Sequence, residues 1–232
     1  MPLPLTAIRA VVFDMDDTLY AERDYVRSGY EAVGEHLRGR LGRDDRFEDW
    51  LWRRFCAGSA GGAFDALNSE RGLGLSEAQI AELVEVYRQH RPKIHPRAGV
   101  AELLARLHGE FRLGLLSDGY LPAQEWKLDA LGLRRFFEAV VFTEAMGREA
   151  WKPSPAGYEA VRERLGVPHS RSAYVGDNPA KDFLAPNRLG WRTIRLRCDG
   201  QVHAQNIPPE GGAPRVTVTS LADLDEALRR SD

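Results

Sequence analysis

The chain is poor in cysteine, in charge of one sign and in long hydrophobic runs, and each shortage excludes a class of protein. Its two cysteines, Cys56 and Cys198, form no CxxC pair, so neither a disulfide framework nor a zinc site is expected, and we predict two buried thiols. The 32 basic and 34 acidic residues give a net charge of −2, which provides no overall attraction to nucleic acid or to an anionic membrane. We therefore expect a small-molecule partner.

No apolar run approaches the roughly 18 to 20 residues that a membrane-spanning helix needs. Residues 1–10 also lack the basic and then apolar order of a secretion signal, so the cytoplasm is the expected location. With 232 residues, of which 43% are hydrophobic, the chain is long enough for one large domain or for a core with a small companion. The sequence leaves the oligomeric state open.

Short apolar segments that end at polar residues or glycine recur along the chain and predict β-strands. We predict strands at residues 10–13, 113–116, 139–142, 173–175, 193–196 and 216–218. Helix-length segments lie between them at residues 100–107, 122–131, 155–165, 179–189 and 221–229. Because strands and helices alternate, and the strands are apolar almost throughout, we predict an α/β fold, a Rossmann-like parallel sheet sandwiched by helices.

About a hundred residues separate the first predicted strand from the second, and their pattern is helical. Apolar residues recur every three or four positions within residues 26–41, 47–55 and 80–87. Ser76 and Gln79 form a capping-box pattern before the last of these helices, and a glycine-rich connection precedes it at residues 57–63. We predict an inserted α-helical bundle. The core domain would comprise residues 1–20 and 95–232, and the helical domain residues 21–94.

Three carboxylates, Asp14, Asp16 and Asp17, directly follow the first predicted strand. Open α/β sheets bind their ligands at the carboxyl ends of the strands, and carboxylates this close repel one another unless they share a cation or a proton. An oxygen-only set with no nearby histidine or cysteine suits Mg²⁺ rather than Zn²⁺. A solvated acidic turn is the alternative for this segment taken alone.

Three later segments add complementary chemistry. Ser117 and Asp118 follow the second predicted strand, and a serine hydroxyl with a flexible backbone suits a phosphoryl oxygen. Lys152, one of only four lysines beside 28 arginines, offers a compact positive charge. Asp177 ends a later strand, with Asp182 at the expected start of the next helix. Each alone could be a turn or a surface charge, but loops after parallel strands converge, so together they predict a phosphoryl-binding site.

Taken in order, these segments resemble the four motifs of the haloacid dehalogenase-like hydrolase superfamily, over nearly the whole chain. The motifs are Asp14-x-Asp16-x-Thr18, Ser117, Lys152-Pro153, and Gly176-Asp177 with Asp182. The helical insertion resembles the bundle-type cap of that superfamily. Dehalogenases lack the second aspartate, so Asp16 makes the chain resemble the phosphatase branch. The resemblance implies a Mg²⁺-dependent phosphatase that acts on a small phosphorylated metabolite, either a sugar phosphate or a nucleotide monophosphate.

The resemblance also implies a role for each motif residue. Asp14 would attack the phosphorus and form an aspartyl-phosphate, while Asp16 would protonate the leaving group and then activate water. The phosphoryl oxygens would be bound by Ser117 and Lys152. Mg²⁺ would be held by Asp14, the main-chain carbonyl of Asp16, and Asp177. The residues that support these positions would be Thr18, Asp118 and Asp182.

Two alternatives stay open. A phosphomutase of the same superfamily would return the phosphoryl group from Asp14 to a sugar instead of to water. A receiver-type phosphoacceptor domain is a non-enzymatic alternative that uses similar residue types. Its phosphorylated aspartate, however, follows a middle strand, and such a domain is much shorter than this chain and has no cap.

Overall fold

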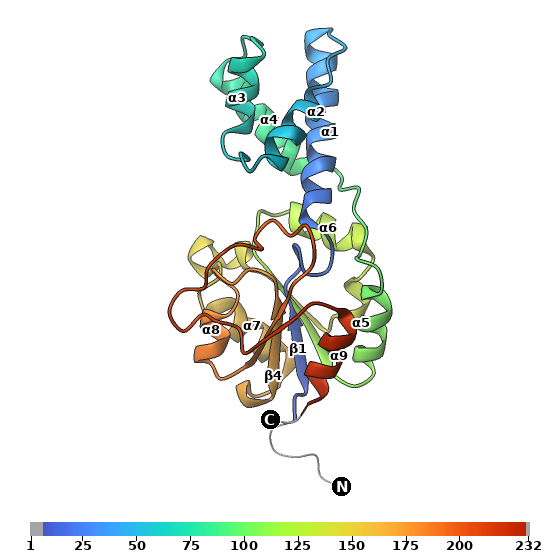
Figure 1. The fold of residues 1–232 in the computed structure, drawn as a ribbon, viewed down its shortest axis with the longest axis vertical. Coiled ribbons are helices and arrows are strands. Elements are labelled where there is room, and N and C mark those ends of the chain that lie inside the picture. The colour runs from blue at the N-terminus through green and yellow to red at the C-terminus, as the bar shows by residue number, and fades with distance from the viewer. Residues whose placement is uncertain (1–6, 231–232) are drawn as a thin grey trace. The chain divides into compact units, whose positions relative to one another are not determined.

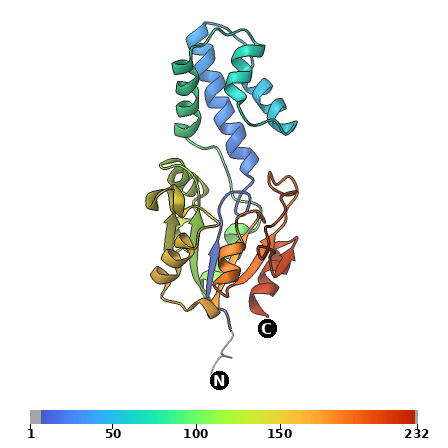
Figure 2. The same ribbon diagram turned by 90° about the vertical axis from the view of Figure 1, so that its left-hand side faces the viewer.

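The computed structural model describes residues 7–230, and the chain divides into two compact units. The first unit is drawn from Met1–Arg23 and His95–Asp232, and the second is Asp24–Ile94. Figures 1 and 2 show the ribbon from two directions. Within residues 7–230, no helix combines the length and the apolar character needed to cross a membrane.

The first unit is built on one six-stranded parallel sheet. Its strands are β1 (Ala10–Phe13), β2 (Arg112–Ser117), β3 (Ala139–Phe142), β4 (Ser172–Gly176), β5 (Arg192–Leu196) and β6 (Val216–Val218). They lie in the order β3-β2-β1-β4-β5-β6, and every pair is parallel. The direction of strand order changes beside β1, which is where doubly wound sheets bind ligands. The predicted α/β fold class is confirmed.

The first unit also contains helices, most of which cover the two faces of this sheet. They are α5 (Val100–His108), α6 (Ala123–Leu131), α7 (Ala156–Leu165), α8 (Leu184–Arg188) and α9 (Leu221–Arg229), with short 3₁₀ turns at Arg134–Phe136, Thr143–Met146, Arg148–Ala150 and His169–Arg171. Helices α7 and α8 lie on one side of the sheet, and α5 and α9 on the other (Figure 1). Tyr158, Val161 and Leu165 of α7 pack with sheet residues in one buried cluster. The helical period of apolar residues therefore turns one face of α7 onto the sheet.

Two expectations about this fold were wrong in detail. The helix predicted over residues 179–189 begins only at Leu184, because Asp182 is held in a turn: its carboxylate accepts the Asn178 amide at 2.8 Å, and its own amide donates to the Asn178 carbonyl at 3.0 Å. The two cysteines are not buried. Cys56, the last residue of its helix, is exposed, and Cys198 is half-buried.

The second unit consists of helices around an apolar centre. They are α1 (Glu22–Leu41), whose first two residues belong to the first unit, α2 (Phe47–Cys56), α3 (Ala63–Glu70) and α4 (Glu77–Gln89). The capping box of Ser76 and Gln79 is present at the start of α4. Helix α3 was not predicted, and it packs Ala63 and Leu67 into the same buried cluster as Val33, Leu37 and Leu51. With only eight residues, α3 was too short a pattern to identify from its apolar spacing.

Candidate active site

The carboxyl ends of three neighbouring strands bring the predicted residues together. Phe13 of β1 pairs with Leu115 of β2 on one side and Val175 of β4 on the other. The residues that follow these strands therefore share one edge of the sheet. The Asp14 amide donates to the Val175 carbonyl at 2.8 Å and fixes the start of this edge.

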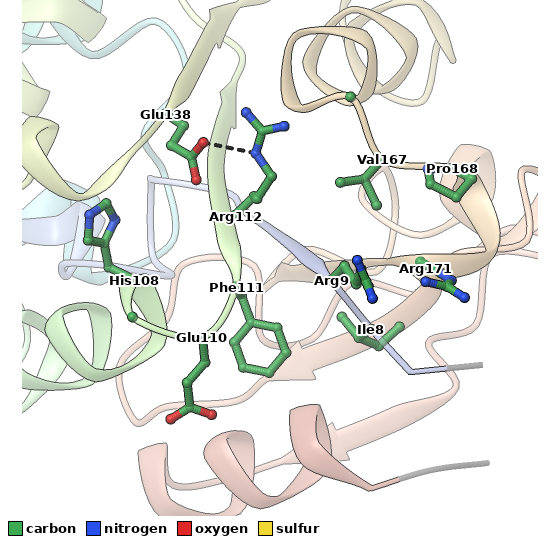
Figure 3. A pocket seen from close by; sticks show the side chains of 12 residues that line it. Ile8, Arg9, His108, Glu110, Phe111, Arg112, Glu138, Val167, Pro168 and Arg171 are labelled. Atoms are coloured by element: carbon green, nitrogen blue, oxygen red, sulfur yellow. Dashed lines mark hydrogen bonds and ion pairs between the residues drawn. The ribbon is translucent and has the colours of Figure 1, made fainter. Parts of the chain in front are cut away.

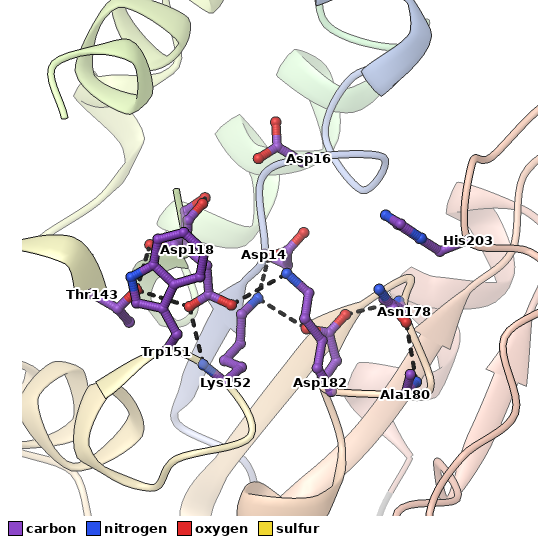
Figure 4. Close-up of polar contacts among 12 residues, drawn as sticks. Asp14, Asp16, Asp118, Thr143, Trp151, Lys152, Asn178, Ala180, Asp182 and His203 are labelled. Carbon is purple, nitrogen blue, oxygen red and sulfur yellow. Dashed lines mark hydrogen bonds and ion pairs between the residues drawn. The ribbon is translucent and has the colours of Figure 1, made fainter. Parts of the chain in front are cut away.

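A buried ammonium joins two of the predicted aspartates. The Lys152 side chain is fully buried, and its Nζ donates to Asp14 Oδ1 and to Asp182 Oδ1 at 2.9 Å (Figure 4). It also donates to the Tyr174 hydroxyl at 3.0 Å. A Cβ atom on Gly176 would lie 2.7 Å from Asp182 Oδ2, so the close approach of Asp182 requires glycine there. The motif residues from three separate loops thus form one polar cluster.

Charge in this cluster is only partly balanced. Burial raises the pKa of Asp14 to about 7, and the Lys152 ammonium opposes this effect. For Lys152, burial alone would lower the pKa, but the Asp14 and Asp182 carboxylates raise it well above its usual value. Lys152 therefore stays charged, while Asp14 is a carboxylate that a further positive charge would help to keep ionised.

A third aspartate makes the cluster suitable for a divalent cation. Carboxylate oxygens of Asp14, Asp177 and Asp182 all lie within 4.8 Å of one another. Asp177 Oδ2 is buried and has no hydrogen-bond partner among the described residues. Burial, followed by the charges of Asp182 and Asp14, raises the pKa of Asp177 well above its usual value. An all-oxygen donor set with an unsatisfied buried carboxylate oxygen fits Mg²⁺.

The Ser117 loop is fixed by its neighbour Asp118. Asp118 Oδ1 accepts the Thr143 hydroxyl at 2.8 Å and the Lys152 amide at 3.2 Å, while Oδ2 accepts Lys181 Nζ at 3.2 Å. Burial would raise the pKa of Asp118, but the Lys152 and Lys181 charges bring it below its usual value. Asp118 therefore ties the serine loop to the loop that carries Lys152, and the buried Ser117 hydroxyl lies beside it.

Asp16 lies apart from the Lys152 cluster, as Figure 4 shows. Its Oδ1 accepts Lys127 Nζ at 2.8 Å and the Tyr20 hydroxyl, and its Oδ2 accepts Gln124 Nε2 at 3.2 Å. Burial would raise the pKa of Asp16, but Lys127 and Tyr20 together bring it below its usual value. The Thr18 hydroxyl points instead to Asp14 Oδ2, at 3.4 Å. The two aspartates of the first motif thus have separate surroundings.

The third carboxylate of the segment, Asp17, has a structural role. It accepts the Glu22 amide at 2.9 Å and the Val202 amide at 2.6 Å, and it pairs with Arg97 at 3.2 Å. Its backbone is left-handed, with φ of 56°. Burial raises the pKa of Asp17, while the Val202 and Glu22 amides and the Arg97 charge oppose this rise. Asp17 therefore joins three chain segments.

Several residues of this site were missed by reasoning from the sequence. They are Tyr20, Gln124, Lys127, Thr143, Tyr174 and Lys181. The scarcity of lysine, which singled out Lys152, would also have found Lys127 and Lys181. The other four residues belong to common types and lie outside the motifs, so no signal in one sequence marks them.

A separate hollow of about 700 Å³ lies at the opposite, amino ends of the strands (Figure 3). Its charged lining residues are Arg9, His108, Glu110, Arg112, Glu138 and Arg171. Arg112 Nε pairs there with Glu138 at 2.9 Å. None of the motif residues lines this hollow, so it is not part of the candidate active site.

Comparison with known proteins agrees with this geometry. Residues 8–190 match the family of haloacid dehalogenase-like hydrolases. The glyceraldehyde 3-phosphate phosphatase of Methanopyrus kandleri is 32% identical over 82% of this chain and 84% of that protein. The pyrimidine 5'-nucleotidase YjjG of Escherichia coli is 31% identical over 79% of this chain and 69% of that protein. The structure of the HAD-hydrolase YfnB from Bacillus subtilis shares the fold, with a TM-score of 0.69, 22% identity and coverage of 97% of this chain and 100% of that one.

Proposed function

Since the chain belongs to the haloacid dehalogenase-like hydrolase family and is a phosphatase, we propose that it hydrolyses small phosphate monoesters with Mg²⁺ through a phosphorylated Asp14. The observation that carries this proposal is the environment of Asp14. Its buried carboxylate lies at the end of β1, receives the fully buried Lys152 ammonium and has the unsatisfied Asp177 oxygen nearby. A nucleophile, a fixed positive charge and a cation site are the parts that phosphoryl transfer requires.

Two steps follow from these side chains. In the first, an Asp14 oxygen bonds to phosphorus and the bond from phosphorus to the leaving oxygen breaks. Asp16 gives that oxygen a proton, so that an alcohol departs, and it must therefore be protonated at this step although Lys127 and Tyr20 lower its pKa. In the second, a water oxygen bonds to phosphorus, Asp16 takes the water proton, and the bond to Asp14 breaks. Inorganic phosphate and the free Asp14 carboxylate result, and Asp16 regains the proton that it had donated.

The remaining motif residues would balance charge. Lys152 and Ser117 would bind the phosphoryl oxygens, and Lys152 would reduce the repulsion between Asp14 and an anionic substrate. Asp14, Asp177 and the main-chain carbonyl of Asp16 would hold Mg²⁺, while Thr18, Asp118 and Asp182 would support these positions. Mg²⁺, when bound, neutralises negative charge on the transferring group.

The substrate class rests on the helical domain and on the relatives. We propose that residues 21–94 act as a cap that selects the leaving group, because such insertions can shield a reactive intermediate from bulk water. The two curated relatives above are named for a triose phosphate and for pyrimidine nucleotides. Both names are compatible with a small phosphorylated metabolite, either a sugar phosphate or a nucleotide monophosphate, as substrate.

A panel of phosphate monoesters, assayed with and without Mg²⁺, tests the proposal. Phosphate release that requires Mg²⁺ is the expected result. An isomeric sugar phosphate without phosphate release would instead identify a phosphomutase. A phosphorylated protein that persists without turnover would identify a phosphoacceptor domain, and either outcome would refute hydrolysis.

A further inference from the structure

We infer that Lys127, together with Gln124, is a positioning residue that fixes the carboxylate of Asp16 from helix α6. This inference rests on the proposed function, in which Asp16 moves protons at the leaving-group oxygen. Lys127 belongs to none of the family motifs identified above. Helix α6 lies beyond the carboxyl ends of the strands, at the same end of the sheet as the candidate active site (Figure 1).

The two oxygens of Asp16 are held by two residues of one helical face. Lys127 Nζ lies 2.8 Å from Oδ1, and Gln124 Nε2 lies 3.2 Å from Oδ2. Residues three apart project from the same side of a helix. Contacts to both oxygens, from side chains that the same helix fixes, restrict rotation of the carboxylate more than either contact could alone.

Burial makes this arrangement rigid. The Lys127 side chain is only 7% exposed, and Gln124 is buried as well. Gln124 Nε2 also donates to the Asp118 carbonyl at 2.7 Å, and its Oε1 lies 3.5 Å from Ser117 Oγ. The start of α6 therefore contacts both the proposed phosphoryl-binding loop and Asp16. One helix thus helps to fix the residue proposed to bind the phosphoryl group and the residue proposed to transfer protons.

The distribution of lysine supports a functional role for Lys127. The chain has only four lysines, and three of them contact carboxylates of this site: Lys127 on Asp16, Lys152 on Asp14 and Lys181 on Asp118. The fourth, Lys93, is 77% exposed in the other unit and pairs with Glu31. Arginine supplies the other 28 basic side chains, so lysine is concentrated where a compact ammonium fits a crowded site.

Leaving-group dependence separates positioning of Asp16 from a merely structural role. An alkyl phosphate needs a proton on its departing oxygen, whereas p-nitrophenyl phosphate releases a stabilised phenolate without one. We expect Lys127→Met to lower kcat about 10- to 100-fold on the alkyl ester that the wild type turns over fastest, and less than about 3-fold on p-nitrophenyl phosphate. KM for both esters and the Mg²⁺ concentration for half-maximal activity should change little.

Matched variants complete the experiment. Lys127→Arg keeps a positive donor and should recover most of the loss, whereas Lys93→Met, the same change at the exposed lysine, should leave both rates unchanged. If Lys127→Met does not fold, as judged by circular dichroism, Lys127→Gln is assayed in the same way. Equal losses on both esters would overturn the inference. A wild-type protein that releases phosphate from neither ester would refute the proposed function itself.

Discussion

The two compact units differ in what they bury. In the described part of the chain, every buried aspartate and lysine lies in the first unit: Asp14, Asp17, Asp118, Lys127, Lys152, Asp177 and Asp182. The second unit buries apolar and aromatic side chains, and Ser28 and His90 are its buried polar residues among those described. Burying a charge costs several kcal/mol unless it is well paired. This concentration of charge indicates that the first unit carries the chemistry.

Charges of the second unit lie near its surface instead. Arg40 pairs with Glu82 at 2.7 Å, and Arg38 pairs with Glu48 at 2.6 Å. In both pairs at least one side chain is partly exposed. Exposed pairs contribute about 0–1 kcal/mol to stability. The stability of the second unit therefore depends on apolar packing. Substitutions of buried charged residues in the first unit should lower activity, whereas substitutions of buried apolar residues in the second unit should lower stability.

The largest expected effect follows removal of the proposed nucleophile. Asp14→Asn retains the size of the side chain but cannot form an acyl phosphate, so kcat for phosphate release should fall on the order of 10⁴-fold or more. The far-UV circular dichroism should be unchanged, because the substitution removes a buried carboxylate without leaving a cavity. Appreciable turnover by this variant would contradict the assignment of Asp14.

The same chemical change in the second unit provides the control. Glu48 is 16% exposed and accepts Arg38 Nη1 at 2.6 Å. Glu48→Gln should cost about 1 kcal/mol of stability or less and leave kcat within about twofold. A loss of activity comparable to that of Asp14→Asn would show that buried charge does not distinguish the two units.

A smaller effect, on stability alone, is expected from the apolar centre of the second unit. Leu37 on α1 is fully buried, and Leu37→Ala should lower the free energy of unfolding by about 2–5 kcal/mol. Leu165→Ala, at an equally buried position on α7 of the first unit, is the matched variant. Urea denaturation measures both, and activity per folded molecule on p-nitrophenyl phosphate should stay within about threefold of wild type.

The denaturation curves also test whether the units unfold separately. If they do, Leu37→Ala shifts one transition and Leu165→Ala the other, whereas a single cooperative unit shifts as a whole. An unchanged free energy of unfolding for Leu37→Ala would contradict the packing of the helical unit around this residue.

Sequence patterns predicted the features that depend on residues close together in the sequence, namely the strands and the motif residues at their carboxyl ends. Apolar runs identified the strands, and because the carboxyl ends of parallel strands meet at one edge, the motif order predicted that Asp14, Lys152 and Asp177 would meet. Helix α3 was missed because it has only eight residues and its N-terminus lies next to a glycine-rich segment. The late start of α8 was missed because a side-chain bond, from the Asn178 amide to Asp182, replaces the first helical turn.

The environment of Asp16 depended on tertiary structure and could not be predicted. Gln124 and Lys127 lie more than a hundred residues from Asp16 in sequence, on a helix whose apolar period gives no indication of what its polar residues contact. Asp17 stands next to Asp16 in sequence but bonds to the Val202 amide of a distant loop. Asp16 and Asp17 therefore have different roles because each contacts residues that are distant in the sequence, and no local pattern predicts these contacts.

The sharpest test of the cation site concerns Asp177, where a moderate change in stability is expected. Without a divalent ion, its buried carboxylate has an unsatisfied oxygen and is repelled by Asp182 and Asp14. Asp177→Asn removes that charge, so the metal-free variant should be more stable than the metal-free wild type by about 1–3 kcal/mol. Mg²⁺ binds only the folded state, so it should raise the melting temperature of the wild type and have little effect on the variant.

Asp199→Asn is the control, because Asp199 is an exposed aspartate of the same unit. Its melting temperature should match that of the wild type both in EDTA and in Mg²⁺. If Mg²⁺ stabilised Asp177→Asn as much as the wild type, the cation would be held elsewhere. The Asp14, Asp177 and Asp182 carboxylates would then not form the cation site, and the contrast between the two units would no longer indicate a metal-dependent reaction.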